Sequence, residues 1–119
     1  LIKEKIVGNP GFDFYSENNN SIMLFGEAKY VAKTNAYNNA LKQIEEFSIS
    51  GKDINDIASI DRFFSEEALK NANDGNKGYI AAFSSTEIET EDLIRNIQSN
   101  GHYKNLSSHK ELICVAVTI

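Results

Sequence analysis

The sequence is poor in cysteine and proline, with one residue of each, and it has neither a long apolar run nor an excess of basic residues. A single cysteine, Cys114, excludes an internal disulfide and favours a reducing compartment. We therefore expect a cytoplasmic protein in which Cys114 is a small buried side chain. No stretch reaches the roughly 18–20 apolar residues of a bilayer span, and the N-terminus lacks a secretory-signal pattern, so no membrane partner is expected.

The charge balance is acidic, with 12 Lys and Arg residues against 17 Asp and Glu residues and a formal net charge of −5. Proteins that bind nucleic acid rely on basic side chains to neutralise phosphates, so this acidity argues against a domain that binds DNA by itself. It does not exclude a nuclease, because metal-binding carboxylates add negative charge. In that case we expect a partner domain or a second subunit to supply the basic surface.

The length of 119 residues, with 41% hydrophobic and 24% charged residues, is typical of one globular domain. There is no internal repeat and no proline-rich linker, so residues 1–119 are expected to form a single domain. Because the chain begins with Leu1 instead of Met, we expect this domain to be a fragment of a longer protein.

Hydrophobic periodicity and turn residues predict the element order strand, strand, helices, strand, helix, strand. The expected strands are 12–16, 21–31, 79–83 and 112–119, and the expected helices are 34–48, 54–64, 65–72 and 90–101. This order favours an α/β fold with helices packed on a central mixed sheet. The segment 21–31 is apolar on both faces, which predicts a central strand that is covered on both sides.

Alternation along the first strand predicts Phe12 and Phe14 on one face and Asp13 and Tyr15 on the other. The expected helix boundaries come from capping residues. N-terminal caps are expected at Thr34, Ser65 and Thr90. Gly51 and Gly101 are expected to end helices. Isoleucines 54, 57 and 60 are expected on the apolar face of the second helix, and Leu93, Ile94 and Ile97 on that of the last.

Glu27 and Lys29 are two residues apart in an otherwise apolar strand, so their side chains should project from one face, about 7 Å apart. Burying either charge without a partner would be costly. A hairpin would bring the carboxylate of Asp13, on the preceding strand, beside that of Glu27. Two adjacent carboxylates repel each other unless a cation neutralises them, and Mg²⁺ prefers such oxygen ligands. A nearby ammonium can then position a metal-bound water for attack on a phosphodiester.

Gly-Phe-Asp at 11–13, a turn, and an apolar strand with Glu-Ala-Lys at 27–29 resemble the core of the PD-(D/E)xK nuclease superfamily. The resemblance covers 12–47 by motif and the rest by element order, and it implies a restriction-endonuclease-like fold. It also implies that Asp13 and Glu27 bind Mg²⁺ or Mn²⁺ and that Lys29 serves the attacking water.

Two further site residues follow from the same resemblance. The Ala28 carbonyl would be an additional metal ligand. Gln43 matches a glutamine or tyrosine that many family members carry on the next helix near the site. It falls at the edge of the apolar face of the 34–48 helix, from which it can point toward the sheet.

The resemblance implies a metal-dependent endonuclease or phosphodiesterase that hydrolyses DNA, with RNA as an alternative substrate. Glu-Ala-Lys nucleases of bacterial antiphage defence are a plausible subgroup. The sequence also departs from the family pattern. Pro10 does not directly precede Asp13, and the helix that usually precedes the first core strand is missing, so we expect that helix upstream of Leu1.

The alternative function is a catalytically silent binding or interaction module that keeps the nuclease fold within a larger protein. An acid-x-lysine pair on a strand also often marks an ordinary solvated face. Two histidines, His102 and His109, fall in a segment expected to be a polar loop. They have no cysteine or acid at ligand spacing and are expected at the surface. Lys42 is interpreted as a surface lysine, with phosphate contact as the alternative.

Overall fold

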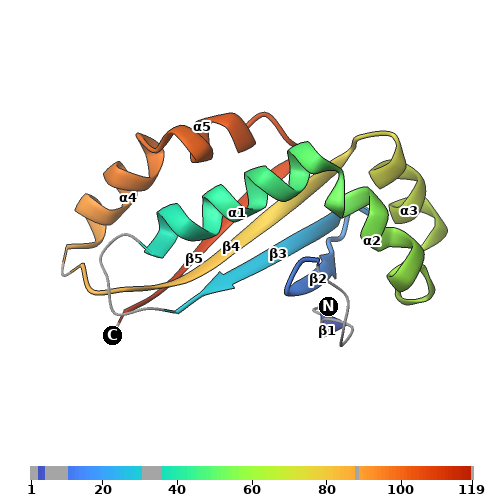
Figure 1. The fold of residues 1–119 in the computed structure, drawn as a ribbon, viewed down its shortest axis with the longest axis horizontal. Coiled ribbons are helices and arrows are strands. Elements are labelled where there is room, and N and C mark those ends of the chain that lie inside the picture. Colours follow the sequence, from blue (N-terminus) through green and yellow to red (C-terminus); the bar gives the residue numbers. More distant parts are fainter. Residues whose placement is uncertain (1–2, 5–10, 31–35, 88, 119) are drawn as a thin grey trace.

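The computed structural model describes residues 3–4, 11–30, 36–87 and 89–118. These residues form a mixed five-stranded sheet in the order β1-β2-β3-β4-β5, packed against helices (Figure 1). The strands are β1 Lys3–Glu4, β2 Phe14–Glu17, β3 Met23–Lys29, β4 Lys77–Ser85 and β5 Glu111–Thr118. The helices are α1 Ala36–Ser50, α2 Lys52–Ile60, α3 Glu66–Asn73, α4 Thr90–Gln98 and α5 Gly101–Leu106, with a 3₁₀ turn, η1, at Asp61–Phe63. The expected α/β fold with a mixed sheet is confirmed.

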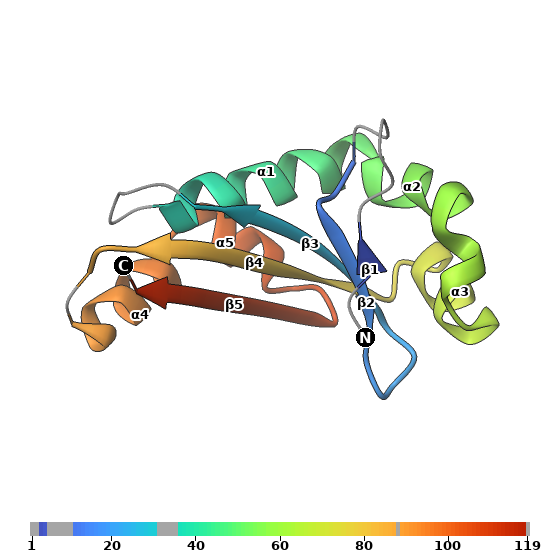
Figure 2. The same cartoon turned by 90° about the horizontal axis from the view of Figure 1, so that it is seen from below.

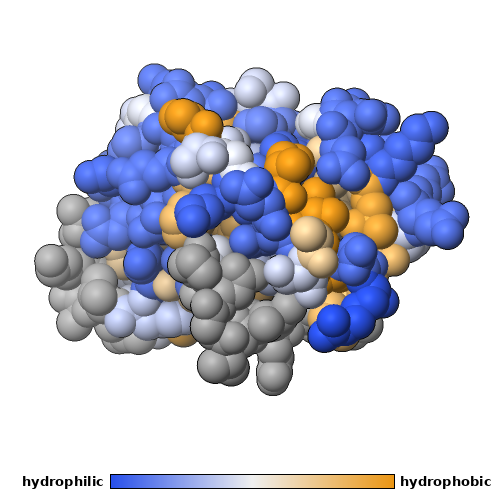
Figure 3. All heavy atoms as spheres, turned by 45° about the vertical axis from the view of Figure 1, so that its right-hand side comes forward, coloured by the Kyte–Doolittle hydropathy of each residue, from blue (hydrophilic) through white to orange (hydrophobic). Residues whose placement is uncertain are grey.

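The strands β1, β2 and β3 pair antiparallel, whereas β3, β4 and β5 pair parallel. Both parallel connections run through helices, and β3 is central, as expected. None of the helices in the described part of the chain combines the length and apolarity that a bilayer span requires. Figure 3 shows the molecule with the end formed by α2 and α3 turned forward. Hydrophilic residues cover much of this surface and surround an apolar area.

Helices α1, α4 and α5 lie over one face of the sheet, and α2 and α3 gather at the end where β3 and β4 begin (Figures 1 and 2). The core between the layers contains Phe25, Tyr79 and Phe83 from the strands and Leu41 and Ile44 from α1. The described helices cover β3 on one face only, yet the strand is buried on both faces from Met23 to Glu27, so the expectation of a covered strand is confirmed for that stretch. The connections from β3 to β4 and from β4 to β5 advance in the same direction, and right-handed crossovers then place their helices on the same face.

The opposite face of the sheet carries an apolar hollow. It is lined by Phe14, Tyr30, Ile80, Ala82, Ile113 and Val115. The phenyl ring of Phe14 lies over Gly26, where a Cβ would collide with it, so the glycine makes room for the ring.

The expected alternation of Phe12 and Phe14 is also wrong. The strand β2 begins only at Phe14, so the two-residue period does not extend back to Phe12. The ring centroid of Phe12 lies 5.3 Å from that of Phe25 and 5.2 Å from that of Phe47, on the helix side. Phe12 and Tyr15 therefore share the core, and Phe14 lies on the other face.

Several helix boundaries agree with the sequence. Gly51 follows α1 with φ 79°, and the Ser65 hydroxyl accepts the backbone N–H of Ala68 at the start of α3. Thr34 falls outside the described residues.

Other helix boundaries differ from the expectation. Thr90 is the first residue of α4 and Glu89 holds its N-cap position, and α2 ends at Ile60, before the expected residue 64. The expectation that Gly101 ends the last helix is wrong, because it is the first residue of a separate helix, α5. The Asn100 side chain caps α5, which the sequence pattern did not reveal.

Two isoleucines expected in the core are exposed. Ile54 of α2 is 38% exposed and Ile94 of α4 is 47% exposed, whereas Leu93 and Ile97 are buried. Asp53 takes the buried position that Ile54 was expected to hold. Sequence spacing alone did not show that polar partners from the sheet reach this helix.

Candidate functional site

Glu27 and Lys29 lie near the end of β3 and project toward the helices, on the same face as Phe25. The Lys29 Nζ lies 3.9 Å from the Glu27 Oε1. Glu27 is only 5% exposed, whereas the Lys29 side chain is 36% exposed. The pair thus joins a buried carboxylate to an ammonium at the solvent boundary.

Asp13 precedes β2 directly and contacts β3. Its backbone N–H donates to the Gly26 carbonyl at 2.9 Å, and its carboxylate Oδ2 accepts the backbone N–H of Ala28 at 3.0 Å. The N–H and C=O of one strand residue point to the same side, so the Ala28 carbonyl is directed toward the Asp13 side of β3. The structure therefore brings Asp13 to the strand segment that holds Glu27 and Lys29.

The electrostatics of Tyr15 give a second view of this arrangement. Its phenol is buried, and burial together with a hydrogen bond to Asp56 raises its pKa far above the usual range. The charges of Asp13 and Glu27 raise this pKa further. Both carboxylates are therefore within electrostatic range of one phenol on the helix side of the sheet.

Gln43 lines the same hollow as Lys29. This hollow has a volume of about 410 Å³ and lies between β3 and α1. It is lined by Lys29, Asn39, Lys42, Gln43 and Glu46. The helix thus brings Gln43 to Lys29, as the sequence suggested, together with the ammonium of Lys42.

The donor set fits a small divalent cation by its chemistry. Asp13, Glu27 and the Ala28 carbonyl offer only oxygen atoms, which Mg²⁺ and Mn²⁺ accept while keeping several waters. Among the described residues, no group of three or more His, Cys, Asp and Glu side chains is arranged to hold a metal ion. Two carboxylates and one carbonyl would therefore have to suffice, with water completing the coordination.

Sequence reasoning missed two buried acids on α2. Asp56 is 3% exposed, and its Oδ2 accepts the Tyr15 hydroxyl at 2.7 Å and the Phe12 backbone N–H at 3.1 Å. Asp53 is fully buried, accepts the Tyr79 hydroxyl at 2.7 Å and lies 2.5 Å from the Lys77 Nζ. The available signal was that both acids share a helical face with Ile57 and Ile60.

The expected polar loop is wrong for His102, which lies in a helix, and confirmed for His109, which lies in the connection between α5 and β5. His102 lies in α5 and its Nδ1 is 2.8 Å from Oε1 of Glu45, an acid partner on α1. This hydrogen bond lowers the pKa of Glu45. The ring of His109 packs edge-on against Tyr79, and burial lowers its pKa.

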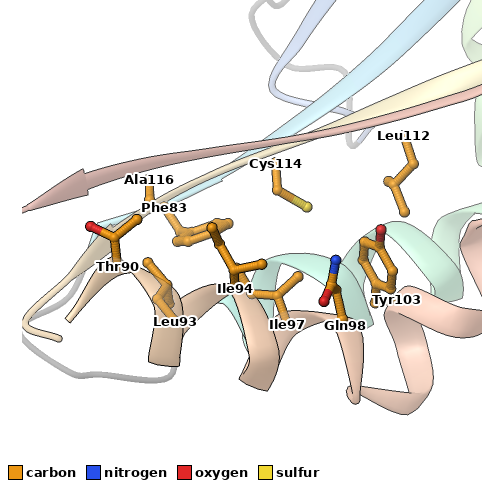
Figure 4. A pocket seen from close by; sticks show the side chains of 10 residues that line it. All are labelled: Phe83, Thr90, Leu93, Ile94, Ile97, Gln98, Tyr103, Leu112, Cys114 and Ala116. Atoms are coloured by element: carbon orange, nitrogen blue, oxygen red, sulfur yellow. The ribbon is translucent and has the colours of Figure 1, made fainter.

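Cys114 is partly buried in an apolar hollow of about 240 Å³ between β5 and the α4–α5 layer. In Figure 4 its sulfur points into the hollow toward the side chains of Ile97 and Gln98 on α4. Burial raises the pKa of the thiol to about 11. The group is therefore protonated at neutral pH and behaves as a small apolar side chain, in agreement with the sequence interpretation.

No protein-family model matches the chain, and no curated protein or solved structure matches it.

Proposed function

We propose that this domain is a metal-dependent nuclease of the PD-(D/E)xK type that hydrolyses DNA as part of a longer protein. One hydrogen bond supports the proposal most. The Asp13 carboxylate accepts the backbone N–H of Ala28, the residue between Glu27 and Lys29. The element order, an antiparallel β2–β3 hairpin followed by helices and the parallel strand β4, agrees with the resemblance.

In this proposal each residue has a defined role. Asp13, Glu27 and the Ala28 carbonyl would hold one Mg²⁺ or Mn²⁺ ion, which when bound polarises a phosphate and activates water. Lys29 orients the attacking water and stabilises negative charge that develops on the phosphate. Gln43, in the same hollow, supplies an amide that can fix the water or a phosphate oxygen.

The substrate assignment rests on charge as well as on the site. Lys29 and Lys42 line one hollow and offer two ammonium groups to a phosphate backbone. The net charge of −5 is unfavourable for tight DNA binding by the domain alone. The proposal therefore includes a partner domain or subunit that provides the basic surface, with RNA as the other substrate to be tested.

A second candidate function is a silent interaction module with the same fold. The apolar hollow of Phe14, Ile80, Ile113 and Val115 on the helix-free face of the described sheet favours it, because exposed apolar surfaces often mark interaction sites. The hydrogen bond of the Asp13 carboxylate to Ala28 is also compatible with a purely structural role.

The deciding experiment combines Mn²⁺ binding with DNA cleavage by the full-length protein. Wild-type protein should bind Mn²⁺ and cleave in Mg²⁺ or Mn²⁺, and excess chelator should abolish cleavage. Ca²⁺ should bind without supporting turnover, because its coordination is looser. Asp13→Asn should lose binding and cleavage, whereas Asp61→Asn, at an exposed acid of η1, should retain both. Cleavage that persists in chelator, or equal binding by the two variants, would reject the nuclease proposal.

A further inference from the structure

Asp56 makes contact with the chain on both sides of Asp13. It lies on α2, far from Asp13 in sequence, yet its Oδ2 accepts the Phe12 N–H and the Tyr15 hydroxyl. Phe12 precedes Asp13 directly, and Tyr15 follows it by two residues. One buried carboxylate oxygen thus holds both flanks of the segment that carries Asp13.

The packing around Asp56 leaves little freedom for this contact. A Cβ at Gly11 would overlap the Asp56 carboxylate, so the carboxylate rests directly against the Gly11 backbone. Tyr15 is 1% exposed, and its hydroxyl donates to the Asp56 Oδ2 at 2.7 Å. Glycine at position 11 and tyrosine at position 15 are therefore both explained by Asp56.

The Asp13 segment is held from two directions. Asp56 of α2 holds Phe12 and Tyr15, while β3 holds Asp13 through the Gly26 carbonyl and the Ala28 N–H. Because β2 begins only at Phe14, ladder hydrogen bonds do not fix residues 11–13 by themselves. The helix contact replaces part of that ladder.

We propose that Asp56 is a positioning residue, whose buried carboxylate sets the place of the Asp13 carboxylate against Ala28. In combination with the nuclease proposal, on which this part rests, Asp56 tunes metal binding without touching the metal. Groups that orient a metal ligand in this way typically change metal affinity by about 10- to 100-fold when they are removed.

Asp53 provides an internal comparison, because it makes a similar contact elsewhere. The Tyr79 hydroxyl donates to Asp53 as the Tyr15 hydroxyl donates to Asp56, and both tyrosines are buried. Tyr79 lies on β4 and does not flank Asp13. Tyr15→Phe and Tyr79→Phe are therefore matched changes, each removing one hydroxyl from a buried α2 carboxylate.

The test is hydrogen exchange of the Ala28 amide, measured by NMR in chelator and normalised to the amides of α4, which carries none of the substitutions. Asp56→Ala should lower the protection of Ala28 by at least about fivefold, because the acceptor on Ala28 is no longer held in place. Tyr15→Phe should act in the same direction with a milder effect on folding, and Tyr79→Phe should leave the normalised value unchanged. Tyr15→Phe keeps the test valid if Asp56→Ala does not fold.

Mn²⁺ affinity is the second readout. A drop of about 10-fold or more in Asp56→Ala or Tyr15→Phe, with none in Tyr79→Phe, supports the positioning role. Unchanged Ala28 protection, or an equal loss in Tyr79→Phe, overturns it. Wild-type protein that binds no Mn²⁺ rejects the nuclease proposal instead, while the exchange result still decides whether Asp56 positions Asp13.

Discussion

The carboxylate of Asp13 accepts the backbone N–H of Ala28 at 3.0 Å, which joins two residues 15 positions apart at the end of the β2–β3 hairpin. This hydrogen bond places an acid beside a strand segment with a buried glutamate and a half-exposed lysine. It also gives Asp13 a structural role whether or not a metal binds.

Glu27→Gln removes the buried charge at nearly constant volume. We expect loss of Mn²⁺ binding and cleavage, with a free energy of unfolding in chelator that is unchanged or higher, because carboxylate repulsion is relieved. The lost contact with Lys29 should cost less than about 1 kcal/mol, since the distance is 3.9 Å and the lysine is 36% exposed. Urea unfolding in chelator measures the stability, and a loss of several kcal/mol would instead indicate a structural role for Glu27.

Lys29→Met keeps much of the aliphatic stem and removes the ammonium. If Lys29 orients the attacking water, kcat should fall by about 10²- to 10⁴-fold while the Mn²⁺ dissociation constant changes little. Lys42→Met is the matched control, because Lys42 lines the same hollow from α1. It should raise KM for DNA more than it lowers kcat. Equal losses of kcat in both variants would contradict a specific role for Lys29.

Asp53→Asn should be strongly destabilising. The Lys77 ammonium lies 2.5 Å from the Asp53 carboxylate, and its side chain is 11% exposed. Removing the acid leaves a buried cation without its counter-charge, which typically costs about 3–5 kcal/mol. Replacing both partners, in Asp53→Asn with Lys77→Met, should recover part of the loss. Thermal or urea unfolding of wild type, Asp53→Asn and the double variant tests this. An Asp53→Asn protein as stable as wild type would refute it.

Alkylation of Cys114 should be slow near neutral pH. Burial raises its pKa from 9.0 to about 11, so at pH 8 the thiolate fraction and the rate should be about 100-fold below those of an ordinary thiol. Because the folded pKa lies above the unfolded value, the thiol contribution to stability is present below pH 9 and is lost as the pH rises toward 11. The rate of alkylation by iodoacetamide, compared between folded and urea-unfolded protein, tests the slow reaction of Cys114. Equal rates would contradict it.

The sequence was sufficient for the α/β fold, the central position of β3 and several helix boundaries. Those features follow from local signals: apolar periodicity in α1, the glycine at position 51 and the Ser65 cap. The placement of Glu27 and Lys29 on one face also follows from strand alternation alone. Each of these predictions depends on residues close together in the chain.

The tertiary structure alone decided which polar groups meet. Asp56 with Tyr15, Asp53 with Lys77, and His102 with Glu45 are distant in sequence, and they pair because burial makes an unsatisfied charge or hydroxyl costly. The direction of the two parallel crossovers put α1, α4 and α5 over the same face, which apolar residues on both faces of β3 could not reveal. Sequence therefore determined the elements and the candidate acids, and packing determined how Asp13 reaches Ala28 and what holds it there.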